Sequence, residues 1–74
     1  MDSFRKRILQ AFKESRKLAE ILPSDGQLDN VEFRLSQIFT REELGQMDGR
    51  TFSRQVERVW PIARYIDKTA GENG

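Results

Sequence analysis

The sequence predicts an all-α fold, a small bundle of four short helices in a single domain, or of five if Pro61 starts a new helix. Apolar residues recur every three or four positions through most of the chain, and no segment alternates apolar and polar residues as a strand does. Capping residues, glycines and prolines divide the chain into short segments. We expect the domain to cover residues 1–69, and residues 70–74, which have nothing to bury, to form a frayed tail.

The first predicted helix is long and amphipathic, from Ser3 as N-cap to Leu22, directly before Pro23. Its apolar residues share one face, and at ~100° per residue its basic residues gather on the opposite face. Arg7 and two basic neighbours fall in the first turns, where the helix dipole favours carboxylates, so helix stability alone does not explain them. The residues of the basic face are Arg5, Lys6, Lys13, Arg16 and Lys17.

The next two predicted helices are shorter. A turn at residues 23–26 precedes a helix over about 28–39, whose apolar residues repeat at helical spacing. Thr40 and Glu43 then have the spacing of a capping box, in which each side chain accepts a backbone N–H from the other residue. This box predicts a short third helix that ends at about Met47.

The fourth predicted helix begins at Thr51, a suitable N-cap, and meets Pro61. Proline lacks a backbone donor and disfavours helical geometry at the preceding residue, here Trp60. We therefore expect this helix to kink or end near Trp60. Pro61 would then serve as the first residue of a fifth helix that reaches about Thr69.

The apolar positions of these helices define an expected core. If the apolar residues at the edges of the helical faces are all exposed, a partner or a second copy must cover them. The edge residues are Leu9, Phe33, Phe39 and Ile62. The core residues are Phe4, Ile8, Phe12, Leu18, Leu22, Leu28, Val31, Leu35, Ile38, Leu44, Phe52, Val56, Val59 and Ile66.

The composition excludes most chemistry. The 74 residues include no cysteine and no histidine, so the commonest nucleophile–base pairs and soft metal ligands are missing. No phosphate loop or dinucleotide fingerprint is present. We expect no enzyme, no cofactor and no bound metal. No apolar run approaches the ~20 residues of a membrane span, and no secretory signal is visible, so we expect a cytoplasmic protein.

One segment is similar to a known metal-binding loop. Residues 25–33 resemble the second half of an EF-hand, with a glycine at the sharp turn and Glu32 at the exit. Most calcium ligands come from the first half of such a loop, where Ile21 and Pro23 offer no side-chain oxygen. We therefore expect no calcium site.

Charge is distributed unevenly along the chain, although the net charge is only +1. Residues 1–17 hold six basic and two acidic side chains, whereas residues 20–48 hold seven acidic and two basic ones. A basic helix packed beside an acidic one would satisfy this layout internally, which is the interpretation we favour. The alternative is a basic face presented to a partner.

A chain without reactive residues acts by binding, and we expect a small protein-binding module, an adaptor or inhibitor, whose partner has an acidic surface. Arginine, tryptophan and tyrosine dominate protein interfaces. An alternative role for Trp60 is to close the core, with its N–H bonded to a carbonyl. The expected contact residues are the basic face of the first helix together with Arg54, Arg58, Trp60, Arg64 and Tyr65.

Two other functions stay open. Residues 40–60 resemble a degenerate helix-turn-helix, in which Ser53, Arg54 and Gln55 have suitable chemistry to read bases. Glu42 and Glu43 would repel phosphate there, and a net charge of +1 leaves little to neutralise DNA, so we favour nucleic acid less. The second alternative is a structural subunit of a homo-oligomer. We expect no membrane binding, because the first helix lacks tryptophan and tyrosine.

Overall fold

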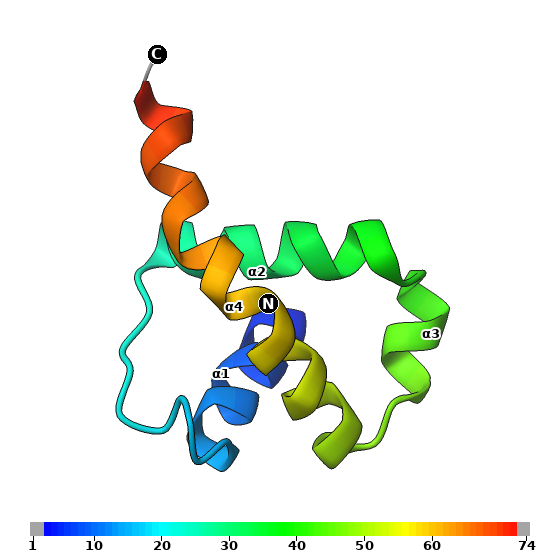
Figure 1. Ribbon diagram of the computed structural model, residues 1–74. Helices are drawn as coiled ribbons and strands as arrows, with labels where there is room; N and C mark the ends of the chain where they lie inside the picture. The colour runs from blue at the N-terminus through cyan, green and yellow to red at the C-terminus, as the bar shows by residue number, and fades with distance from the viewer. Residues whose placement is uncertain (1–2, 73–74) are drawn as a thin grey trace.

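The chain folds into helices connected by loops, as described by a computed structural model that covers residues 3–72, with side chains described for residues 3–65 (Figure 1). The helices are α1 (Ser3–Glu14), α2 (Asp25–Ile38), α3 (Arg41–Gln46) and α4 (Gly49–Glu72). No strand occurs in this part of the chain, so the all-α prediction is confirmed, with four helices and not five. No helix within it is long and apolar enough to cross a membrane.

The helices pack around one core. α4 crosses the molecule and makes its most extensive contact with α2, while α1 packs against both (Figure 1). The short α3 connects α2 to α4 at one end (Figure 1). The radius of gyration is 11.9 Å, close to the ~11 Å expected of a compact domain of this length.

Most of the expected core is confirmed. Phe4 is partly buried and packs against the core from its edge, and Ile66 lies outside the residues whose side chains are described. The core also contains three residues that the core prediction omitted: Ala11, Trp60 and Ala63. The confirmed core residues are Ile8, Phe12, Leu18, Leu28, Val31, Leu35, Leu44, Phe52, Val56 and Val59.

The first helix is shorter than predicted, because α1 ends at Glu14 and not at Leu22. Ser15 competes with helical bonding: its hydroxyl donates to the Glu57 carboxylate on α4, and its carbonyl and hydroxyl oxygens both accept from the Leu18 N–H. Leu18 still reaches the core from this turn. Leu22 was expected in the core, but it lies in the connection to α2 and is 94% exposed.

α2 starts and ends earlier than predicted. Ser24 is its N-cap and forms a capping box with Gln27, which places the helix start at Asp25. At the other end the chain turns extended at Phe39, whose side chain packs against the core. Ile38 was also expected in the core but is 59% exposed, because Phe39 takes the inward direction.

α3 agrees with the prediction. The Thr40 hydroxyl accepts from the Glu43 N–H at 3.0 Å, and the Glu43 carboxylate accepts from the Thr40 N–H at 2.8 Å. The helix ends at Gln46 with Met47 as its C-cap. The capping box is therefore confirmed.

α4 begins before the expected cap, because Asp48 has the bonding of an N-cap. Its carboxylate accepts from the Thr51 N–H at 2.7 Å, and its carbonyl accepts from the Phe52 N–H at 2.9 Å. The two hydrogen bonds from Thr51, one from its N–H and one from its side chain, lower the pKa of Asp48 below its ordinary value of 3.8, and Arg50 adds a smaller effect in the same direction.

The expected break at Pro61 does not occur, since α4 continues through it to Glu72. Pro61 lies on the exposed side of α4, where water can satisfy the helix carbonyl that loses its N–H partner. Beyond Pro61, Ala63 is fully buried, and the Asn30 side-chain amide donates to its carbonyl at 3.3 Å. Packing against α2 therefore holds the helix on both sides of the proline. The expected tail falls partly on residues 73–74, outside the described residues, and its fraying stays a prediction.

Tertiary contacts explain two of the three basic residues in the first turns of α1, Arg5 and Arg7. The Arg5 guanidinium forms ion pairs with Asp25 and Asp29 of α2. Arg7 donates to the Leu44 and Met47 carbonyls at the end of α3. Part of the charge asymmetry is thus satisfied internally, as the favoured interpretation expected.

Candidate functional site

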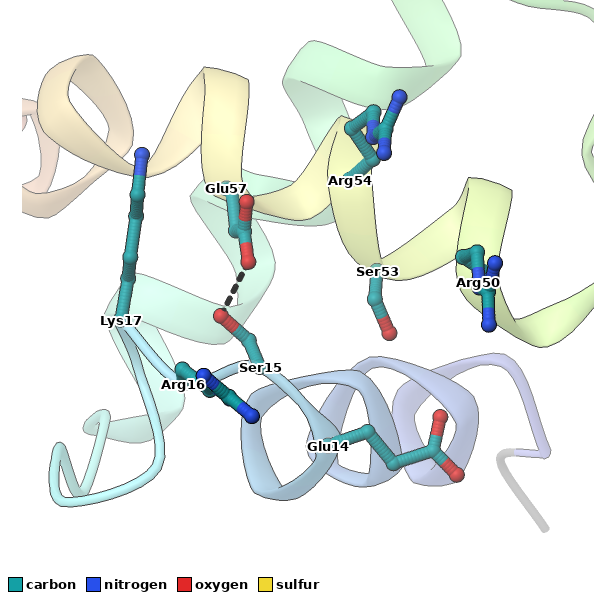
Figure 2. Close-up of a pocket in the computed structure, with 8 residues that line it drawn as sticks. All are labelled: Glu14, Ser15, Arg16, Lys17, Arg50, Ser53, Arg54 and Glu57. Carbon is teal, nitrogen blue, oxygen red and sulfur yellow. Dashed lines mark hydrogen bonds between the residues drawn. The ribbon is translucent and has the colours of Figure 1, made fainter.

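A hollow of about 580 Å³ lies between the C-terminal end of α1 and the first turns of α4. Glu14, Ser15, Arg16 and Lys17 contribute from the end of α1 and the connection after it (Figure 2). The residues from α4 are Arg50, Ser53, Arg54 and Glu57 (Figure 2). We call these eight residues the basic hollow.

The cations of the basic hollow make no direct bonds to the other described residues, although Arg50 lies close enough to Asp48 to contribute to the lowered pKa of that carboxyl group. Within the described part of the chain, none of the four makes a hydrogen bond or ion pair: Arg16, Lys17, Arg50 and Arg54. The two acidic residues of the hollow do have partners. Glu57 accepts from the Ser15 hydroxyl, and Glu14 accepts from the Gln10 amide at 3.0 Å. Four cations and two carboxylates leave the hollow with a net charge of +2.

Ser53 stands out among the residues of the hollow. It is only 8% exposed, and its hydroxyl is a buried polar group with no hydrogen-bond partner. Figure 2 shows this hydroxyl pointing from α4 toward α1, into the space between the two segments. A buried hydroxyl without a partner is uncommon in folded proteins, because its desolvation is not compensated. This position therefore suits a ligand that can supply the missing bond.

The exposed side of α4 carries three arginines one helical turn apart, Arg50, Arg54 and Arg58. The basic hollow borders one side of this row, and Arg50 and Arg54 belong to both. In Figure 2 the Arg54 guanidinium turns away from α1, toward the outer side of α4. Arg58 also lacks a hydrogen bond or ion pair to the other described residues. We call this row the arginine row.

A second hollow, of about 220 Å³, borders the arginine row on the other side, between the end of α2 and α4. We call it the apolar groove. Two of its apolar side chains are largely exposed, Ile38 at 59% and Ile62 at 49%. The groove is lined by Arg34, Ile38, Phe39, Gln55, Arg58, Val59 and Ile62.

Of the four predicted edge residues, Ile62, Leu9 and Phe33 are exposed and Phe39 is partly buried.

The predicted basic face of the first helix is divided by the structure. Arg5 is committed to α2 through its ion pairs. Lys6 and Lys13 are exposed on α1. Arg16 and Lys17 lie beyond the end of α1 and turn to the basic hollow. The face therefore does not form one continuous surface.

The second predicted group, around Trp60, is also separated. Trp60 is buried at 6% exposure and packs edge-on against Phe12, with ring centroids 5.0 Å apart. Its place in the core agrees with the alternative role, but its N–H has no hydrogen-bond partner. Arg64 lies over the exposed Tyr65 ring, 4.7 Å from its centroid. Arg54 and Arg58 remain on the surface, without the tryptophan.

The resemblance to a helix-turn-helix over residues 40–60 extends to the order of the elements, since α3 and the start of α4 lie within it. Of the three residues with base-reading chemistry, Arg54 alone is exposed. Ser53 is buried, and Gln55 is half-buried in the apolar groove. The surface that would face a base is therefore incomplete.

Of the eight residues of the basic hollow, three were predicted as contact residues: Arg16, Lys17 and Arg54. Ser53 was considered only as a base-reading residue. Arg50 could have been found, because it precedes Arg54 and Arg58 at the same four-residue spacing. Ser53 could not, since only the packing of α4 on α1 deprives its hydroxyl of a partner. No family model, curated protein or solved structure matches the chain, so its function is inferred from this geometry alone.

Proposed function

We propose that the chain is a small non-catalytic protein-binding module, an adaptor or inhibitor, that docks the exposed side of α4 on an acidic surface of a partner protein. The observation that carries this proposal is the arginine row. Its three arginines make no hydrogen bond or ion pair within the described residues, and they recur one helical turn apart along the exposed side of α4. Arginines held in this way can form forked hydrogen bonds with carboxylates at little conformational cost.

The surroundings of the row favour a protein as the partner. The apolar groove offers Ile38 and Ile62 beside Arg58, and apolar side chains next to arginine are typical of protein interfaces. A protein that binds nucleic acid gains much of its affinity by neutralising phosphates. Glu14 and Glu57 reduce the positive charge on the side of the arginine row that borders the hollow, which disfavours such binding. Binding to nucleic acid is therefore the alternative that the test has to separate.

The test compares two charge-reversed variants as immobilised bait in a nuclease-treated native lysate. Arg54→Glu/Arg58→Glu changes the arginine row, and Lys6→Glu/Lys13→Glu makes the same change of charge on the exposed side of α1. We expect a partner captured by the wild type to be retained by the α1 variant and lost by the α4 variant. Trp60 is not a suitable position for this test, because a substitution there would disturb the core.

A captured partner is then purified and its affinity for the three baits is measured directly. Equal affinity for the wild type and the α4 variant would contradict the proposed surface. A protein that captures nothing, but binds duplex DNA at about 50 mM salt with steep loss of affinity as salt increases, would contradict the proposed function. A cytoplasmic location and self-association both stay predictions.

A further inference from the structure

We propose that the basic hollow binds a phosphoryl group with two negative charges, carried by a phosphorylated side chain of the partner protein. The source of the group rests on the proposed function. The chemistry of the site does not, since it depends on the residues of the hollow alone.

The charge of the hollow fits such a group. Its net charge of +2 balances a phosphate monoester, which carries nearly two negative charges at neutral pH. The nearest carboxylates are already engaged, because Glu57 accepts from Ser15 and Glu14 accepts from Gln10.

The donors of the hollow come from two segments. Arg16 and Lys17 follow α1, and Arg50 projects from α4 on the side that faces α1 (Figure 2). In Figure 2 the Lys17 side chain extends toward α4 at one end of the hollow, so a bound anion would draw this side chain inward. Arg54 lies at the rim, and its exposed side chain is long enough to turn toward a bound anion. The volume of about 580 Å³ leaves room for the group and the residue that carries it.

Ser53 supplies the observation that separates a binding site from a merely charged surface. Its hydroxyl is buried, lacks a partner and points between α4 and α1 (Figure 2). A solvated basic surface needs no such group. An anion in the hollow would accept a hydrogen bond from this hydroxyl, which the other described residues do not satisfy.

A phosphoryl group suits this set of donors better than a carboxylate does. A carboxylate has one negative charge and two oxygens, so a single arginine fork satisfies most of it. A phosphoryl group has three acceptor oxygens and a larger charge, and it can engage several cations and a hydroxyl together. A phosphodiester of nucleic acid has one negative charge per phosphate and would need a continuous basic track.

The experiment measures binding of inorganic phosphate and of N-acetyl-phosphoserine amide to the full chain by NMR titration at constant ionic strength. Acetate and a short single-stranded oligonucleotide are titrated in parallel. We expect both phosphate probes to shift amide signals around Ser53 and Arg50, and acetate to bind at least about tenfold more weakly. Ser53→Ala and Arg50→Gln should each weaken phosphate binding about tenfold, as expected for one lost hydrogen bond or ion pair to a charged group. Lys6→Gln removes one positive charge from the exposed side of α1, away from the hollow, and is the control that should change binding less than twofold.

Several results would overturn the proposal: equal affinities for acetate and phosphate, unchanged phosphate affinity in both hollow variants, or tighter binding of the oligonucleotide than of phosphoserine. Should Ser53→Ala fail to fold, Arg50→Gln decides alone, because Arg50 is exposed. If phosphate binding is absent while partner capture still depends on the arginine row, this inference fails and the proposed function stands. If phosphate binds while no partner is captured, the proposed function fails and the anion site stands.

Discussion

Arg7 offers a sharp test of how this small domain is held together. Its guanidinium donates to the Leu44 carbonyl at 2.6 Å and to the Met47 carbonyl, and it lies 4.2 Å from the centroid of the Phe52 ring. These carbonyls lie at the end of α3, where a cation is favourable, and the Leu44 carbonyl also accepts from the Met47 N–H at 3.3 Å. Arg7 therefore connects α1, α3 and α4.

Replacing Arg7 by methionine keeps an apolar chain against Phe52 but removes the charge and both donors. Each hydrogen bond from a charged donor contributes about 1.5–3 kcal/mol, and a partly exposed cation–π contact contributes about 0.5–1 kcal/mol. Because Arg7 is only half-buried, the lower values apply, and we expect a loss of about 2–4 kcal/mol. A domain of this length has about 4–11 kcal/mol in total, so the loss is a large share of its stability.

The assay is urea and thermal unfolding followed by circular dichroism. The melting temperature of Arg7→Met should fall by at least about 8 °C. Lys6→Met is the matched control, since it removes the same charge from the neighbouring exposed position and should change stability by less than about 0.5 kcal/mol. Arg7→Lys keeps the charge without the fork and should fall between them. Equal stability of the Arg7→Met and Lys6→Met variants would refute the reasoning.

Three further predictions concern single residues. Because the pKa of Asp48 is lowered in the folded protein, its ionised carboxylate stabilises the fold fully above the ordinary value of 3.8, and this stabilisation is lost as pH falls through the lowered value. Acid unfolding curves should show this loss of stability in the wild type. They should not show it in Asp48→Asn, whose uncharged side chain can still accept from the Thr51 N–H. Trp60→Phe keeps a ring in the core and removes the N–H without a partner, so chemical unfolding should show a loss below about 1.5 kcal/mol, and a larger loss would mean that the N–H is bonded. Leu22→Ser should change stability by less than about 0.5 kcal/mol, against about 2–5 kcal/mol for Leu35→Ala, and similar losses in the two variants would mean that Leu22 packs in the core.

The places where the prediction differs from the structure have a common cause. Helical periodicity continues from α1 to Leu22, but the pattern contains no sign that Ser15 bonds to Glu57 on a helix far along the chain. In the same way, Pro61 is a strong local signal for a helix break. The helix nevertheless continues, with Ala63 buried and its carbonyl accepting from Asn30 of α2, and these contacts are not part of the local pattern.

In the candidate site, too, the sequence predicts which residues are present and tertiary contacts decide how they are arranged. The cations are visible in the sequence, and the spacing of Arg50, Arg54 and Arg58 indicates that they share a helix face. Their meeting with Arg16 depends on the end of α1 at Glu14, which redirects the chain toward α4. Trp60 shows the reverse case, since a residue typical of interfaces is used in the core.

By itself the sequence determined the all-α class, the capping box at Thr40 and most of the core, because these follow from residue type and from contacts within a few positions. Only the tertiary structure decided where the first helix ends, that α4 runs through Pro61, and which arginines are already bonded. The physical reason is that these features depend on interactions between residues about 20 to 40 positions apart. The spacing of residues within one segment carries no information about the energies of such interactions.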